Sequence, residues 1–177
     1  MFKRGLSPII ATVLLIVLTL AAVSILSAFL IPFIRDGLNS SKSCVGGIGK
    51  INFDADSGYN CRFRGDTNKP ARTGFSVNIL SEEIKGFKVG LFSSGSSDVY
   101  EIKDFVSLAK IRMLNKDFNQ ALEVPESGET RTYVAQGDFD KIIIYPIFSD
   151  GSSCNTQEEI VIDECNLPDI ISSLVEH

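Results

Sequence analysis

The sequence predicts an α+β protein in which a long apolar N-terminal helix is followed by a head domain of mainly antiparallel β-strands, a sandwich or small barrel. The helix is predicted because residues 6–35 are apolar almost throughout and contain no charged side chain before Arg35. The sheet is predicted because short apolar runs with alternating polar residues recur after Ala71, separated by turn-forming residues. The roughly 140 residues after the helix are enough for one domain with its own core.

The apolar run is long enough to cross a membrane. A run of about 20 apolar residues spans a bilayer, and one of about 30 extends roughly 45 Å as a helix. Ser7 is suited to cap the helix and Pro8 to occupy its first position. We expect Pro32 to kink or end the helix, because proline removes an internal hydrogen bond.

Two ordinary interpretations compete for this segment. A cleaved secretory signal would end near Ala28, although its apolar region would be much shorter. A simple single-pass anchor would keep Lys3 and Arg4 in the cytoplasm and place the chain after Asp36 outside the cell.

The residues KRGLSPIIATVLLIVLTLAAVSI at the N-terminus resemble the class III signal peptide of an archaeal type IV pilin. In that family the prepilin peptidase cuts before the apolar helix, which here implies cleavage between Gly5 and Leu6, with Lys3 and Arg4 as the signal charges. Bacterial pilins carry a glutamate at the fifth mature position, where this chain has Ile10. Their glutamate-dependent subunit docking is therefore not carried over.

The resemblance implies a structural subunit of an archaeal type IV pilus-like surface filament with a role in adhesion. Its partners would be other copies, the prepilin peptidase, an assembly ATPase and a platform membrane protein. The precursor would lie in the cell membrane, and the assembled filament on the extracellular surface. The implied organisation is a signal peptide at 1–5, a transmembrane and filament-core helix at 6–35, a neck at 36–43 and an extracellular head at 44–177.

Other functions remain open. They are an archaellum-type filament subunit, a surface solute-binding or sensory protein exported through the same class of signal, and a membrane-anchored enzyme. We expect no enzymatic activity, because the sequence holds no phosphate loop, nucleophile elbow or HExxH motif, and its one histidine is His177. No cofactor and no metal are expected.

Small side chains interrupt the apolar run. Ala21, Ser24 and Ala28 lie where neighbouring helix backbones can approach closely, although such residues are also common in ordinary membrane helices. In the polar neck, Asn39 begins an Asn-Ser-Ser sequon and is the glycosylation candidate.

All four cysteines follow the membrane segment, in the portion expected outside the cell. Two disulfides are therefore predicted, with three possible pairings. We favour Cys44 with Cys61 and Cys154 with Cys165, because each pair brackets a turn-rich segment. A zinc site is disfavoured, because the sequence has no CxxC motif.

Period-two alternation marks several strands, and a hairpin is expected across SEEIKG between the first two of them. They cover Phe75 to Ile79, Phe87 to Leu91, Thr130 to Val134, Lys141 to Phe148 and Glu159 to Ile162. Turns are expected at 93–98 and at Asp150-Gly151. Residues 104–124 have spacings that fit an amphipathic helix or a strand, and a short helix is expected after Leu167.

Two head segments, FSVNILSEEIKGFKVGLFSSG and YVAQGDFDKIIIYPIFSDGSSC, are loosely similar to the globular domains of archaeal pilin-like proteins. That similarity favours an immunoglobulin-like sandwich for the head.

The charge balance argues against nucleic acid as a partner. The chain has 22 acidic against 17 basic residues, a formal net charge of −5, which repels phosphate backbones. One basic cluster interrupts this, and we interpret it as ordinary surface charge: Arg62, Arg64, Lys69 and Arg72 around Phe63.

Carboxylates gather in two short stretches. Residues 54–58 (DADSG) resemble the start of a calcium loop but lack its distal glutamate, so we expect a turn. Asp138 and Asp140 are expected to be solvated turn residues.

Overall fold

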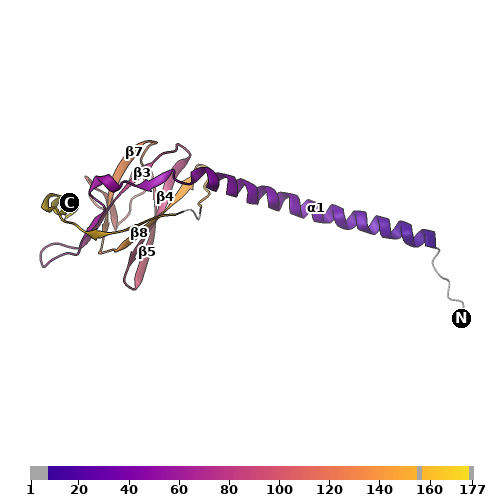
Figure 1. The fold of residues 1–177 in the computed structure, drawn as a ribbon, viewed down its shortest axis with the longest axis horizontal. Coiled ribbons are helices and arrows are strands. Elements are labelled where there is room, and N and C mark those ends of the chain that lie inside the picture. The colour runs from indigo at the N-terminus through magenta and orange to yellow at the C-terminus, as the bar shows by residue number, and fades with distance from the viewer. Residues whose placement is uncertain (1–7, 155–156, 176–177) are drawn as a thin grey trace. The chain divides into compact units, whose positions relative to one another are not determined.

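The structure is a computed structural model that describes residues 8–154 and 157–175. The chain divides into two compact units, an N-terminal helical unit that ends at Lys42 and a β-rich head that begins at Ser43 (Figure 1). This division confirms the predicted fold class.

The first helix, α1, runs from Pro8 to Gly47. It begins at the predicted proline, whose fixed backbone suits the first helical position. Pro32 does not end the helix, one of the two effects expected of it, because it lies inside α1 and the polar stretch predicted as a neck is helical as well. A proline removes one backbone hydrogen bond, and the helix continues on the bonds made by its neighbours.

The head contains ten strands, one 3-10 turn and a second helix among the residues that the structure describes. Five of the strands were not predicted from the sequence: β1 (Ile51–Phe53), β2 (Cys61–Phe63), β5 (Ser96–Lys103), β6 (Ile111–Met113) and β10 (Asp163–Glu164). The other strands are β3 (Arg72–Ile79), β4 (Ile84–Ser93), β7 (Glu129–Gln136), β8 (Lys141–Phe148) and β9 (Glu158–Val161). The 3-10 turn covers Ala55–Ser57, and helix α2 covers Pro168–Val175.

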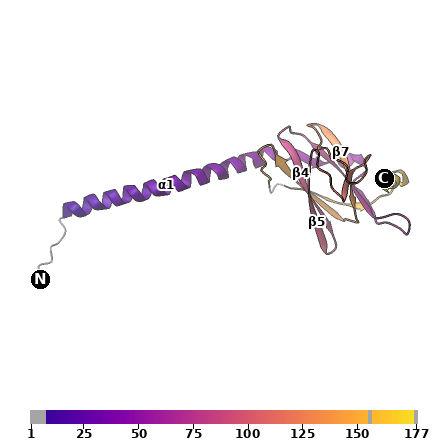
Figure 2. The same ribbon diagram turned by 180° about the vertical axis from the view of Figure 1, so that it is seen from behind.

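The strands form two sheets. One has the order β10-β2-β3-β7-β6, with β1 also paired to β3, and the other has the order β5-β4-β8-β9. Every pair is antiparallel except β10 with β2. Strands β3, β4, β5, β7 and β8 are labelled on the head in Figure 1, and Figure 2 shows β4, β5 and β7 from behind.

This strand order is that of an immunoglobulin-type sandwich. In the seven-strand form of that fold one sheet has the order A-B-E-D and the other C-F-G, and the variable form adds C′ beside C. Here β3, β7 and β6 take the places of B, E and D, while β5, β4, β8 and β9 take those of C′, C, F and G. Strand A is split into β1 and β2, which pair with successive parts of β3. The side-chain Oδ1 of Asn60 fills the gap by accepting from the backbone N–H of Ser76 at 2.7 Å.

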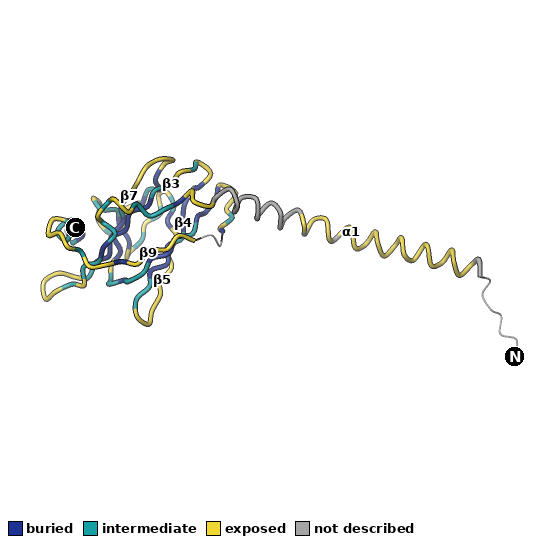
Figure 3. The backbone as a smooth tube through the Cα atoms, viewed as in Figure 1, coloured by how far each residue is buried: buried dark blue, intermediate teal, exposed yellow. Residues whose placement is uncertain are grey.

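The inner faces of the two sheets form one apolar core, drawn as the dark blue centre of the head in Figure 3. Phe75 and Val77 from β3 and Phe87 and Val89 from β4 are fully buried. The ring of Tyr133 on β7 stacks on Phe75 and meets Phe87 of the other sheet edge-on. The apolar residues of these strands face the core as predicted, but the other face of β3 is not open to water, because Ser76 is also buried and its hydroxyl bonds that of Thr132 at 2.8 Å.

The expected hairpin between β3 and β4 is wrong. The two strands lie in different sheets, β3 paired with β7 and β4 with β5 and β8, so the SEEIKG segment crosses from one sheet to the other. Both apolar runs face the same core in either arrangement, so alternation does not distinguish them. The predicted turns at 93–98 and at Asp150-Gly151 do close hairpins, between β4 and β5 and between β8 and β9.

Residues 104–124 form turns around the short strand β6 rather than one helix or one long strand. Two residues here have left-handed backbone angles that interrupt any regular element: Phe105 with φ 64° and Asn119 with φ 65°. The short C-terminal helix is confirmed as α2, whose Leu174 is buried against β3 at Gly74. A Cβ at Gly74 would lie 2.8 Å from the Leu174 side chain, so this glycine makes room for α2.

Candidate assembly surface

The most exposed apolar surface of the described chain is the first part of α1. The segment Ile10–Pro32 has a mean hydropathy of 2.8 over 23 residues, and none of its described side chains is buried. It is long and apolar enough to cross a membrane. Because a helix that is apolar on all sides has no polar face to turn toward water, this segment needs lipid or other apolar helices around it.

Two hydroxyl groups in this segment are satisfied within the helix itself. Thr19 Oγ1 donates to the carbonyl oxygen of Ile16 at 2.9 Å, and Ser24 Oγ donates to that of Leu20 at 2.8 Å. These hydroxyls therefore add no unpaired donor to an apolar environment. Of the predicted packing residues, Ala21, Ser24 and Ala28 are all exposed on α1.

Other predicted site residues are described only in part. The signal charges Lys3 and Arg4 and the cleavage pair Gly5 and Leu6 lie outside the described residues. Asn39 lies within α1, but its side chain belongs to the part that the structure does not describe.

One of the two disulfides is described, and it corrects the favoured pairing. Cys61 is bonded to Cys165, 104 residues further along the chain. The parallel pairing of β10 with β2 brings them together, because it aligns Asp163 with Cys61. Cys154 is buried and also disulfide-bonded, while the side chain of Cys44 lies outside the described set. Sequence alone missed this arrangement because two-residue β10 gives no periodic signal.

The basic cluster does not form a free cationic surface. Arg62 pairs with Asp138 at 3.2 Å, and Arg64 pairs with Glu164 at 2.6 Å. Arg72 is buried, with its guanidinium 5.0 Å from the centre of the Phe118 ring. Two of these cations are therefore neutralised and one is withdrawn from solvent, which leaves little to attract a polyanion.

A buried arginine that the sequence did not single out fixes the end of α2. Arg112 on β6 is fully buried, and burial in a low-dielectric environment lowers its pKa. Its guanidinium donates to the backbone carbonyl oxygens of Met113, Leu114, Lys116, Ser173 and Leu174. The last two acceptors belong to the final turn of α2, where carbonyls lack helical partners and a cation is favourable.

Residues 54–58, whose sequence resembles the start of a calcium loop, are part of a turn, as expected. In this turn Asp54 Oδ1 accepts from the N–H of Asp56. Across residues 8–154 and 157–175, no three acidic, histidine or cysteine side chains are grouped so as to hold a metal ion. Tyr133 has its pKa raised by burial, but its hydroxyl donates to the carbonyl of Glu123 and belongs to the core.

Two of the hollows on the described part of the head are defined by their lining residues. One, of about 350 Å³, is lined by residues of the β3–β4 connection, by Asp104 and by residues 124–127. The other, of about 370 Å³, lies beside β6 and β7. Its Lys116 and Arg131 both bind Glu123, at 2.6 and 2.5 Å, and the Lys116 hydrogen bond is the main cause that lowers the pKa of Glu123.

Comparison of the chain with models of protein families, with curated proteins and with solved structures finds no match in any of the three. The fold and the exposed helix therefore carry the functional argument.

Proposed function

We propose that this chain is a structural subunit of an archaeal type IV pilus-like surface filament, made as a membrane-anchored precursor and assembled through α1. The observation that carries the proposal is the segment Ile10–Pro32, which is apolar and exposed on every side directly behind the basic N-terminus. Burying such a surface contributes about 25 cal/mol for each Å² removed from water. A bundle of copies, or a bilayer before assembly, supplies the required apolar surroundings.

The disulfide of the head supports an extracellular location. Disulfides form and persist in oxidising surroundings, and the described disulfide joins parts of the head that are far apart in sequence. In the proposed filament the heads face outward and make the adhesive contacts. Export of the head with Lys3 and Arg4 left in the cytoplasm follows the positive-inside tendency.

The test is the N-terminal sequence and intact mass of the protein in material sheared from its native cells. We expect a chain that begins at Leu6 in a sedimentable fraction, because the peptidase would remove residues 1–5 before assembly. Added mass on peptides containing Asn39 would report glycosylation.

A matched pair of variants sharpens this test. Gly5→Val should block cleavage, retain Met1 and keep the protein in the membrane, whereas Ile9→Val should be processed and assembled normally. If the unmodified chain retains Met1 and stays only in membranes, the filament proposal is wrong, and an anchored receptor becomes the better hypothesis.

A further inference from the structure

Phe105 is the most exposed large apolar side chain of the head among the described residues. Its side chain is 87% exposed, and its backbone lies in the left-handed region with φ 64°. That region is unfavourable for a bulky residue and is usually occupied by glycine or asparagine. An aromatic residue at this position destabilises the head in two ways, through backbone strain and through exposure of its ring to water.

Hydrogen bonds fix the turn around Phe105, so the backbone holds its side chain in one exposed position. Its backbone N–H donates to the carbonyl of Leu122 at 2.9 Å, and the N–H of Leu122 donates to the carbonyl of Val106 at 2.8 Å. Beside them, Asp104 Oδ1 accepts from the N–H of Val124 at 2.7 Å. Strained residues fixed by their surroundings concentrate at functional sites.

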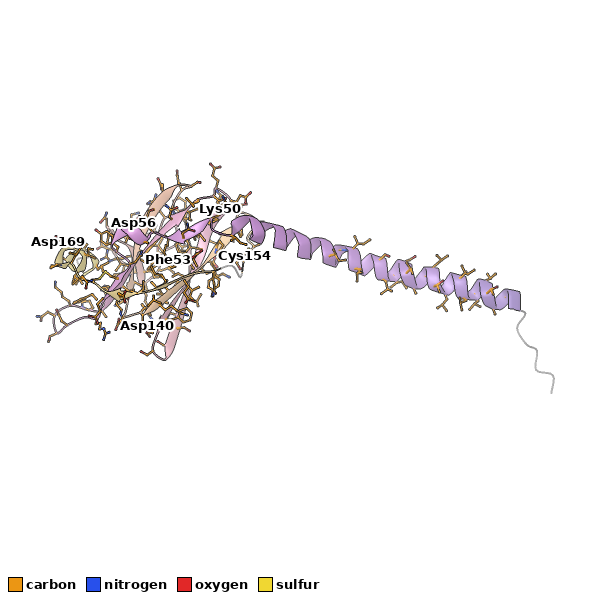
Figure 4. The ribbon with its side chains drawn as sticks, in the orientation of Figure 1. Lys50, Phe53, Asp56, Asp140, Cys154 and Asp169 are labelled. Atoms are coloured by element: carbon orange, nitrogen blue, oxygen red, sulfur yellow. A yellow bond between two sulfur atoms is a disulfide. The ribbon has the colours of Figure 1, made fainter. Side chains whose placement is uncertain are left out.

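Phe105 lies at the end of the sandwich where the chain passes from α1 into β1, which we name the proximal end. Leu80 donates from its backbone to Lys50, just before β1, and Asp104 shares the 350 Å³ hollow with residues of the β3–β4 connection. Figure 4 labels Lys50 and Cys154 at this end of the head and Asp169 at the other. Two further apolar residues at this end are exposed, Ile48 by 61% and Leu80 by 46%.

We infer that Phe105 anchors a contact between this head and a second copy of the chain. The inference rests on the proposed filament. If copies associate through α1, the proximal end of each head is tied to that association, because Gly47, the last residue of α1, is only three residues from Lys50. This short connection keeps the proximal ends of associated copies near one another, so a second copy is the partner within reach of Phe105.

A single aromatic side chain is sufficient for such a role. Interface energy concentrates in a few buried residues, often aromatic, that fill pockets on the partner. A projecting side chain that enters a different surface of the next copy makes a head-to-tail contact, and contacts of that kind propagate into open helical filaments.

The first experiment replaces Phe105 with Asn in the full-length chain and measures two quantities in parallel. Asn tolerates the left-handed backbone, so the thermal unfolding midpoint of the head should stay the same or rise. The amount of the chain in sheared filaments should fall at least about tenfold, because the loss of one interface anchor exceeds 1.4 kcal/mol.

The matched control is Leu167→Asn. Leu167 is 58% exposed and precedes α2, near the opposite end of the head, where Asn is a good helix cap. This variant should preserve both stability and assembly. A head destabilised by Phe105→Asn, or filament yields that are equal for the two variants, would overturn the inference.

The second experiment identifies the partner directly. A photo-crosslinking amino acid at position 105 should give covalent dimers of this chain in sheared filaments, and the same group at position 167 should not. Crosslinks to another protein or to lipid, or none at all, would contradict contact with a second copy. If the unmodified chain is absent from filaments, the proposed function itself fails, so the two failures are distinguishable.

Discussion

The guanidinium of Arg112 joins two segments that are far apart in the sequence, the turn after β6 and the last turn of α2. A buried cation costs desolvation energy unless its donors are paired, and here backbone carbonyl oxygens supply acceptors. Sequence reasoning treats arginine as an exposed residue, so neither Arg112 nor Arg72 could be placed in the interior. Their burial depends on Phe118, whose ring lies within 5.5 Å of both guanidinium groups.

We expect Arg112→Met to lower the free energy of unfolding by about 2–4 kcal/mol. Methionine fills much of the same space, but it leaves buried carbonyls without donors. The measurement is urea unfolding of the full-length protein in detergent. Arg131→Met is the control, since the Arg131 side chain is 27% exposed and its surface ion pairs contribute only about 0–1 kcal/mol. Equal losses in the two variants would contradict the role assigned to Arg112.

At the scale of elements, the disulfide between Cys61 and Cys165 ties the strand pair β2 and β10 at the point where α2 begins. It encloses a separation of 104 residues. Because a long closed loop restricts the unfolded chain strongly, we expect the Cys61→Ala, Cys165→Ala double variant to lose about 2–5 kcal/mol. Thermal unfolding of the oxidised protein should show the loss. If the variant matches the parent, strand pairing alone holds β10.

The apolar segment of α1 makes a second prediction at this scale. Leu20 lies near the middle of Ile10–Pro32 and is exposed. Leu20→Lys should reduce membrane insertion, because a lysine at the centre of a membrane helix costs about 2.5–3.5 kcal/mol on insertion scales. Fractionation of cell membranes after alkaline extraction measures the effect, and Leu20→Ile should remain fully inserted. Retention of the lysine variant would show that this segment does not cross the bilayer.

The long elements could be predicted from the sequence, and their partners could not. The run at 6–35 and the alternation in β3, β4, β7 and β8 are strong local signals. Alternation does not show which strands pair with one another. Phe75 and Phe87 would face one core whether their strands formed a hairpin or lay in different sheets. Strands of two or three residues, such as β10, depend on tertiary pairing and have no periodicity of their own.

At the scale of the whole molecule, the two units have different sources of stability. All buried apolar residues of the described chain lie between Ile51 and Leu174, so the core is supplied by the head alone. The described apolar side chains of α1 are exposed and obtain their stabilisation from lipid or from other copies. Removal of α1 should therefore change solubility and association far more than the folding of the head.

We expect residues 43–177, produced without the rest of α1 and oxidised, to fold and to unfold cooperatively at the same temperature as the head of the full-length chain in detergent. The reason is that every residue of the described core is retained in the fragment. Circular dichroism on heating gives both midpoints, and sedimentation should show a monomer for the fragment and large assemblies for the full chain once detergent is removed. A fragment that unfolds without cooperativity would mean that α1 supports the head, and copies could then not exchange helix contacts without disturbing their cores.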